Sequence, residues 1–362
     1  GSAKQPETYQ GLTGVKLLTK LEKGKISGPQ LVFLMVGFLL GSSVIIVPGQ
    51  TAKQDAWIAI IIGAVEGGLF ALIFTTLARR FPGKTIVEIF DSVFGPYLGK
   101  AIAVIFIWYS FHIGSLAIRN FTDFFTTAVM HETPSIVFAA LLILVSAFAV
   151  GNGLEVIARC SLVLVPLTTF LLIATFFLQL NQLEFRNFFP VLETPFWKLV
   201  KISHSVAVFP FGESVFFLMV FPFLNQPKES RSKTMIGILL AALIMNIDSW
   251  RNIGTLGATG GIFTYPSFEA IRLMNLPFVN TRFEIIVVIN YLTMGFLKIS
   301  VLHYVTVLGL GQIFNQRSIG HLIIPIGLLM IIFSIINFRG VIENLEFNET
   351  VGPIYNAFFQ FI

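Results

Sequence analysis

The chain has 362 residues, of which 55% are hydrophobic and 12% are charged, and its formal net charge is +5. Soluble globular proteins carry about 25% charged residues, so these proportions argue against a water-soluble enzyme, a disordered chain and a nucleic-acid-binding protein. One bilayer crossing needs roughly 20 apolar residues, and the mean hydropathy of +0.83 predicts a protein that spans the lipid bilayer. In such a protein the basic residues mainly set the orientation, so the positive charge does not indicate a nucleic-acid partner.

Apolar runs separated by polar, Gly or Pro residues predict nine membrane helices and the start of a tenth. The nine are Leu31–Pro48, Trp57–Leu77, Ala101–Val129, Ser135–Val150, Ser161–Leu180, Val200–Phe223, Met235–Trp250, Ile285–Phe314 and Leu322–Phe338. The tenth begins near Ile354 and is too short to cross about 30 Å of hydrocarbon at 1.5 Å per residue, so we expect an incomplete last helix.

The order of helix lengths predicts two repeats of five helices, residues 29–180 and 200–362. They follow a tail at residues 1–28 that begins with an expression scar, Gly1-Ser2. Because five is odd, the second repeat must enter the membrane from the opposite side, as in the inverted repeats of many secondary transporters. Ten unrelated helices are the alternative. Predicted inner segments hold 14 Lys and Arg residues against 8 in the outer ones, which predicts a cytoplasmic amino terminus.

Small or helix-breaking residues interrupt the first and sixth helices, and we expect a ligand site there. The segment Gly41-Ser42-Ser43-Val44 lies in mid-membrane, where freed backbone amides are tolerated only if they line a cavity. These amides favour an anionic group such as a carboxylate, whereas close helix packing by small residues is the alternative. In the sixth helix, Phe209-Pro210-Phe211-Gly212-Glu213 combines a break with a carboxylate. A glutamate in hydrocarbon indicates function: Glu213 binds a ligand ammonium group, titrates during coupling, or only holds a neighbouring helix.

A polar stripe follows one face of the third helix. Tyr109, His112, Arg119 and Asp123 lie at helical spacings. Tyr109 and His112 are candidate donors to a ligand carboxylate, with packing as the alternative for His112. Arg119 and Asp123 are expected to pair with each other.

The eighth helix repeats a polar residue every seven positions, at Glu284, Tyr291 and Lys298. Lys298 near mid-span is interpreted as a fixed positive charge at the place where a sodium-coupled transporter binds its ion. The alternative is a lysine that snorkels to the membrane interface. Glu66 in the second helix is expected to be a further buried carboxylate.

Outside the predicted helices the sequence offers few chemical signals. The stretch from Arg251 to Arg282, with a short helix predicted at Ser267–Leu276, is either a lid over an outer vestibule or a plain connector. Nucleophile elbows, phosphate-binding glycine loops and zinc signatures are lacking, which argues against an enzyme. One cysteine, Cys160, and five histidines without ligand spacing predict no disulfide, no metal and no cofactor.

A series of short segments along the chain resembles the spore germination permeases, the B subunits of bacterial endospore germinant receptors, in the amino acid–polyamine–organocation transporter superfamily. The segments are Ile26-Ser27-Gly28-Pro29-Gln30, Phe81-Pro82-Gly83-Lys84-Thr85, Gly95-Pro96-Tyr97-Leu98-Gly99-Lys100, Thr133-Pro134, Gly153-Leu154-Glu155-Val156-Ile157-Ala158-Arg159, Phe189-Pro190-Val191-Leu192, Phe211-Gly212-Glu213, Tyr265-Pro266 and the helix around Lys298. None is diagnostic alone, but their order extends over about 300 residues. The seventh helix, with Asn246, Asp248 and Arg251, is more polar than the family pattern.

The resemblance implies a ten-helix, five-plus-five inverted fold with a ligand site between helices one, three, six and eight. It places the site on Gly41, Ser42, Ser43 and Val44 and on Phe209, Gly212 and Glu213. It also implies an amino acid or similar nutrient as ligand, partner A and C subunits, and the inner membrane of a spore. Two functions remain open: a sensor that signals to its partner subunits, and an amino acid transporter that is proton-coupled or facilitative.

Overall fold

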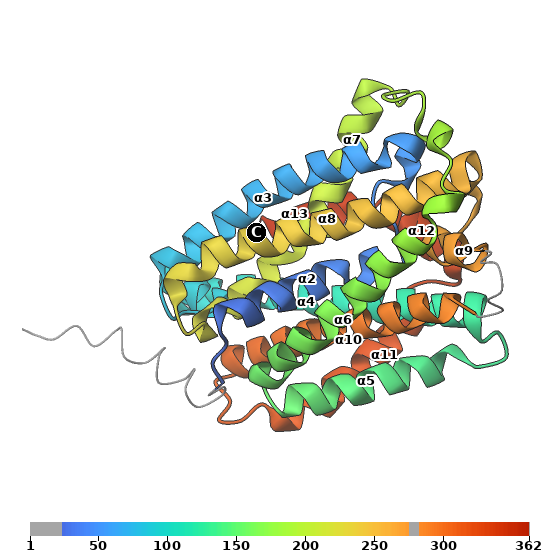
Figure 1. Ribbon diagram of the computed structural model, residues 1–362. Coiled ribbons are helices and arrows are strands. Elements are labelled where there is room, and N and C mark those ends of the chain that lie inside the picture. Colours follow the sequence, from blue (N-terminus) through green and yellow to red (C-terminus); the bar gives the residue numbers. More distant parts are fainter. Residues whose placement is uncertain (1–23, 275–281, 362) are drawn as a thin grey trace, which may run out of the picture.

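The computed structural model describes residues 24–274 and 282–361. In these ranges all the secondary-structure elements are helices (Figure 1). The first half contributes α2 (Gly28–Ser43), α3 (Ala56–Arg80), α4 (Ile86–Phe124), α5 (Ser135–Gly151) and α6 (Leu154–Leu178). The second half contributes α7 (Phe196–Val208), α8 (Ser230–Leu256), α9 (Pro266–Arg272), α10 (Glu284–Ile313), α11 (Gly320–Ile336), α12 (Val341–Glu349) and α13 (Gly352–Gln360). The predicted all-α fold is confirmed. Most of the predicted tail and the end of the Ser267–Leu276 helix lie outside the described residues.

Six of these helical segments are long and apolar enough to cross a membrane, and a seventh is if α11 and α12, bent by 95°, form one span. The short apolar helices α2 and α5 have 16 and 17 residues. Helix α2 is short because its span continues as non-helical chain from Val44 to Pro48 and then as the 3₁₀ segment η1 (Gln50–Asp55). The chain is therefore a multi-pass membrane protein.

Apart from the breaks in the first and sixth helices, three helices begin or end more than five residues from the bounds that the apolar runs predict. The α4 segment starts at Ile86 instead of Ala101, because Thr85 and Glu88 form a capping box for a short first helix. Gly95, with φ of 79° and ψ of 174°, is not helical, and its kink separates this short helix from the long one that follows. Helix α6 starts at Leu154 instead of Ser161. Helix α8 continues past Trp250 to Leu256, because its polar side chains find buried partners there.

Both predicted breaks are present, in the first and the sixth helix. Helix α7 ends at Val208, Phe209 is extended with φ of −130° and ψ of 117°, and Pro210 leads into the buried 3₁₀ segment η5 (Phe211–Met219). Proline has no N–H to continue the helix ladder, so backbone groups are freed at this point. The two halves also meet near the start of the described chain, where the Ile26 N–H donates to the Phe223 carbonyl at 2.9 Å.

The long helices lie roughly side by side (Figure 1), with α3 and α8 along one side of the bundle and α5 and α11 along the other. Between them α10 packs against α2, α4 and α6. The C-terminal helix α13 packs one face, with Asn356 and Gln360 buried, against α7 and η5, while Ile354 and Phe358 on its other side are exposed. The breaks in the first and sixth helices therefore face α10 and α13 in the middle of the protein.

Candidate functional site

The centre of the candidate site is an ion pair between the sixth and eighth membrane helices. The Lys298 Nζ on α10 donates to the Glu213 Oε2 on η5 at 2.5 Å, and each side chain is 1% exposed. The Lys298 ammonium also lies 4.8 Å from the Phe209 ring centre and 5.4 Å from that of Phe38. Removing two charges from solvent is costly, and it is compensated only when the pair is close and well oriented. This geometry meets that condition.

A narrow cavity opens beside this ion pair. Ser42 from α2, Phe209, Glu213 and Lys298 line one side. The Ser42 hydroxyl is buried and has no hydrogen-bond partner among the described residues. The cavity volume is about 20 Å³, enough for one water molecule but far too small for an amino acid.

The opposite wall comes from the last two helices, which the apolar pattern did not place at the site. Its lining residues are Phe347, Asn348, Gly352, Pro353 and Asn356. The Tyr109 hydroxyl donates to the Asn356 Oδ1 at 3.2 Å, and the Gln360 Nε2 donates to the Tyr109 hydroxyl at 3.1 Å. Gln360 also donates to the Val208 carbonyl, freed at the end of α7, at 2.9 Å.

The signal that could have revealed this wall is the spacing of its amide side chains. Asn344 and Asn348 are four residues apart, as are Asn356 and Gln360, so each pair lies on one helix face. The Asn344 Nδ2 donates to the Asn120 Oδ1 at 2.8 Å and to the Asp123 Oδ2 at 3.0 Å.

The structure brings together about half of the residues predicted for the site. Ser42, Phe209, Glu213 and Lys298 line the cavity. Gly41 lies against the Lys298 side chain, since a Cβ added there would be 2.5 Å from the Lys298 Cβ. Gly212 likewise has no room for a side chain beside Gln360, and Tyr109 holds the C-terminal wall in place.

Four other predicted residues point away from the cavity. The Ser43 hydroxyl donates to the Leu39 carbonyl at 2.7 Å, and Val44 lines a separate cavity that also includes Tyr291. His112 stacks on Trp108, so its packing alternative matches the geometry.

The expectation that Glu66 is a buried carboxylate is wrong. Its Oε1 lies 2.6 Å from the His204 Nδ1 on α7, and the two side chains are 31% and 49% exposed. Neighbouring apolar residues Val65 and Leu69 on α3 are also exposed, at 65% and 56%. Glu66 therefore lies on the outer face of the bundle and does not reach the cavity, because rotation of α3 is set by its packing on α7 and α8.

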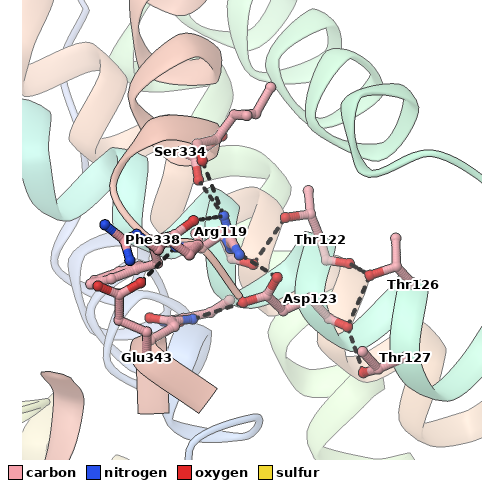
Figure 2. A network of polar contacts seen from close by, with 12 residues as sticks. Arg119, Thr122, Asp123, Thr126, Thr127, Ser334, Phe338 and Glu343 are labelled. Atoms are coloured by element: carbon pink, nitrogen blue, oxygen red, sulfur yellow. Dashed lines mark hydrogen bonds and ion pairs between the residues drawn. The ribbon is translucent and has the colours of Figure 1, made fainter. Parts of the chain in front are cut away.

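Arg119 forms the predicted pair with Asp123, with its Nε 2.8 Å from the Asp123 Oδ1 (Figure 2). Its Nη1 also donates to the carbonyls of Ser334, Ile335 and Phe338 at 3.0 to 3.3 Å. These carbonyls have no helical partner because the chain bends by 95° between α11 and α12. Arg119 thus stabilises the bend that directs α12 and α13 back against the bundle.

A second polar cluster lies near the C-terminal end of α8. Arg251, expected in an outer loop, is 1% exposed on α8 and pairs with Asp248. The Ser267 hydroxyl on α9 donates to the Asp248 Oδ2 at 2.5 Å, and the Asn252 Nδ2 donates to Ser267 at 2.8 Å. The polar residues of the seventh helix thus join α8 to α9. Among the residues that the structure describes, no group of His, Cys, Asp and Glu side chains is placed to hold a metal ion.

The helix order and the two breaks define a class of fold, the all-α membrane fold with inverted repeats and broken helices. A sodium-coupled sialic acid symporter matches 97% of this chain and 82% of its own at a TM-score of 0.71 and 9% identity. MHP1, a nucleobase-cation-symport-1 family transporter, matches 91% of this chain and 75% of its own, at a TM-score of 0.63 and 12% identity. MhsT in complex with L-phenylalanine matches 99% of this chain and 90% of its own, at a TM-score of 0.54 and 17% identity. At such identities the likeness concerns the fold alone.

Sequence comparison then identifies the family. The chain belongs to the spore germination protein (spore permease) family, whose pattern matches residues 25–339. It is 30% identical to spore germination protein KB of Bacillus subtilis (strain 168), over 92% of this chain and 91% of that protein. It is 23% identical to spore germination protein YndE of the same organism, over 85% and 86% of the two chains.

Proposed function

We propose that this protein is the B-type subunit of a germinant receptor, and that it binds a small zwitterionic nutrient, an amino acid, between Glu213 and Lys298. The observation that carries the proposal is the buried ion pair at the break of the sixth helix, beside a cavity lined by the break of the first. Ion pairs buried to this degree are weak evidence for stability, which leaves a role in binding as the better account of their presence.

The chemistry of the pair matches an amino acid. The ligand carboxylate takes the place of Glu213 at the Lys298 ammonium, and the ligand ammonium takes the place of Lys298 at the Glu213 carboxylate. Both buried charges then keep an opposite partner, so binding avoids the penalty of an uncompensated charge. The free Ser42 hydroxyl supplies one further hydrogen bond.

Binding also requires movement, because the cavity holds only about 20 Å³. We expect the wall formed by α12 and α13 to be the part that yields, since these two helices have nine residues each. The wall is held by amide hydrogen bonds to Tyr109, Asn120 and Val208 and by aromatic contacts such as that of Phe359 with Tyr109. A ligand that binds only the open arrangement shifts the population towards it. In the sensor function this shift is passed to the A and C subunits, in the inner membrane of the spore and with the amino terminus cytoplasmic.

Transport is the alternative function, and the structural likeness to symporters favours it. One of the structurally similar proteins holds L-phenylalanine. In this case the same pair binds an amino acid that crosses the membrane, by facilitated diffusion or with a proton. Either role is one of binding and movement, without catalysis.

The test is the thermal stability of the purified protein with each of the common amino acids. A ligand at 100 times its dissociation constant is expected to add about 2.7 kcal/mol to the free energy of unfolding. Glu213→Gln is expected to abolish the shift, whereas Glu66→Gln, which changes a carboxylate on the outer face, is expected to retain it. The amide and the deaminated acid of the active amino acid are expected to fail, because each lacks one of the two charges.

Binding of the uncharged analogues with unchanged affinity, or an unaltered shift in Glu213→Gln, would remove the ion pair from the site. Uptake of the active amino acid into liposomes containing the protein then separates the two functions. Uptake that saturates and is lost in Glu213→Gln supports transport, and binding without uptake supports the sensor.

A further inference from the structure

A second cavity, remote from the Glu213–Lys298 pair, lies at the end of the bundle where α3 ends and α8 begins. These two ends lie side by side at the left of Figure 1. The cavity volume is about 300 Å³, much larger than that beside the ion pair. Arg79, Lys84 and Lys228 line it, together with Ser230 and an apolar wall that includes Phe221 and Pro222.

The charges around this basic cavity are not balanced. Three cationic side chains line it, and among the described residues no carboxylate does. Lys84 donates to the neutral Ser92 hydroxyl at 2.8 Å. The nearest acidic residue in sequence, Glu229, lies 3.9 Å from Lys233 and does not line the cavity. An anion in the cavity relieves the repulsion between the three cations.

The first turn of α8 provides a second and independent indication of an anion. Helix α8 has 27 residues, and the Ser230 N–H at its start already donates to the Pro227 carbonyl, so what this end offers an anion is the positive end of the helix dipole. The Ser230 hydroxyl is buried, with 2% exposure, and has no hydrogen-bond partner among the described residues. A buried hydroxyl without a partner is costly, and a bound oxyanion supplies the missing acceptor.

We propose that the basic cavity binds a phosphate group, and that the group is the headgroup phosphate of an anionic phospholipid. Arg79, Lys84 and Lys228 neutralise the phosphate, and the Ser230 hydroxyl, at the positive end of the α8 dipole, donates to one of its oxygens. The wall of Phe221 and Pro222 takes the apolar glycerol and the first part of an acyl chain. The site lies directly after the apolar span of α3, at the level where headgroups are found, and basic pockets between membrane helices suit such lipids.

Native mass spectrometry of the full chain in a neutral detergent tests this proposal, with dioleoyl phosphatidylglycerol as the probe and dioleoyl phosphatidylcholine as the neutral comparison. The triple variant Arg79→Gln, Lys84→Gln, Lys228→Gln is expected to weaken phosphatidylglycerol binding at least tenfold. The matched control removes three cations outside the cavity, at the same end of the protein: Lys25→Gln, Arg80→Gln, Arg231→Gln. It is expected to change binding less than threefold. An equal loss in both triple variants would show unspecific attraction to basic residues and overturn the proposal.

Ser230→Asp keeps the proposal testable if the triple variant does not fold. An acidic residue is favourable in the first turn of a helix, so the fold is expected to be retained. Its carboxylate occupies the anion site, so phosphatidylglycerol binding is expected to be lost. Unchanged binding in this variant would refute the site.

Inorganic phosphate distinguishes the two sources of the ligand. If millimolar phosphate fails to displace the lipid, the headgroup is the ligand. If phosphate displaces it and itself raises the melting temperature of the wild type but not of Ser230→Asp, the site is confirmed as a phosphate site for a soluble compound.

Discussion

Breaking the Glu213–Lys298 pair one residue at a time is expected to be far more damaging than replacing both residues. Lys298→Met retains most of the buried side-chain volume but leaves the Glu213 carboxylate, 1% exposed, without its cationic partner. Loss of one member of a buried ion pair costs about 3–5 kcal/mol, because the remaining charge stays buried and uncompensated. The cation–π contacts with Phe38 and Phe209 are lost as well.

The double variant Glu213→Met, Lys298→Met removes both charges and fills their space with apolar atoms of similar volume. Such replacements are often neutral or stabilising, so we expect its free energy of unfolding to lie within about 1–2 kcal/mol of the wild type. Unfolding in mild detergent, with sodium dodecyl sulfate as denaturant and tryptophan fluorescence as signal, is measured for the wild type, the single variants Glu213→Met and Lys298→Met, and the double variant. The double variant must be more stable than either single one. If the two single losses simply add, the residues do not interact and the pair is refuted.

Two further predictions concern packing around the site. Gly41→Ala places a Cβ 2.5 Å from the Lys298 Cβ and is expected to lower the free energy of unfolding by about 1–3 kcal/mol in the same assay. Gly261→Ala, whose added Cβ has no atom within 4 Å, is the control and is expected to be neutral. Equal effects of the two variants would contradict the close approach of α2 to α10. Arg119→Gln removes the ion pair with Asp123 and the donors to the three carbonyls after α11, so amide hydrogen exchange across residues 341–349 is expected to accelerate. Arg159→Gln, which breaks an exposed pair with Glu155, is the control, and equal exchange in both variants would mean that Arg119 does not hold the bend.

The class of protein, the helix breaks and two of the buried charges can be predicted from the sequence alone. The scarcity of charge and the length of the apolar runs determine a membrane protein, since a bilayer excludes unpaired polar groups. Proline and glycine mark the breaks after Ser43 and at Phe209, because their backbone effects are local. A charge within an apolar run is conspicuous, which is why the sequence alone singles out Glu213 and Lys298.

Which residues meet was decided by the tertiary structure. Helical spacing tells which side chains share a face, but not towards which neighbour that face turns. Glu213 and Lys298 are 85 residues apart and pair only because η5 packs against α10. Glu66, equally conspicuous in the sequence, turns outward to His204. The amides of α12 and α13 reach the cavity only because the chain bends by 95° after α11. Composition and helical periodicity depend only on residues that are near in sequence, whereas the rotation and bending of each helix are set by contacts with helices that are distant in sequence.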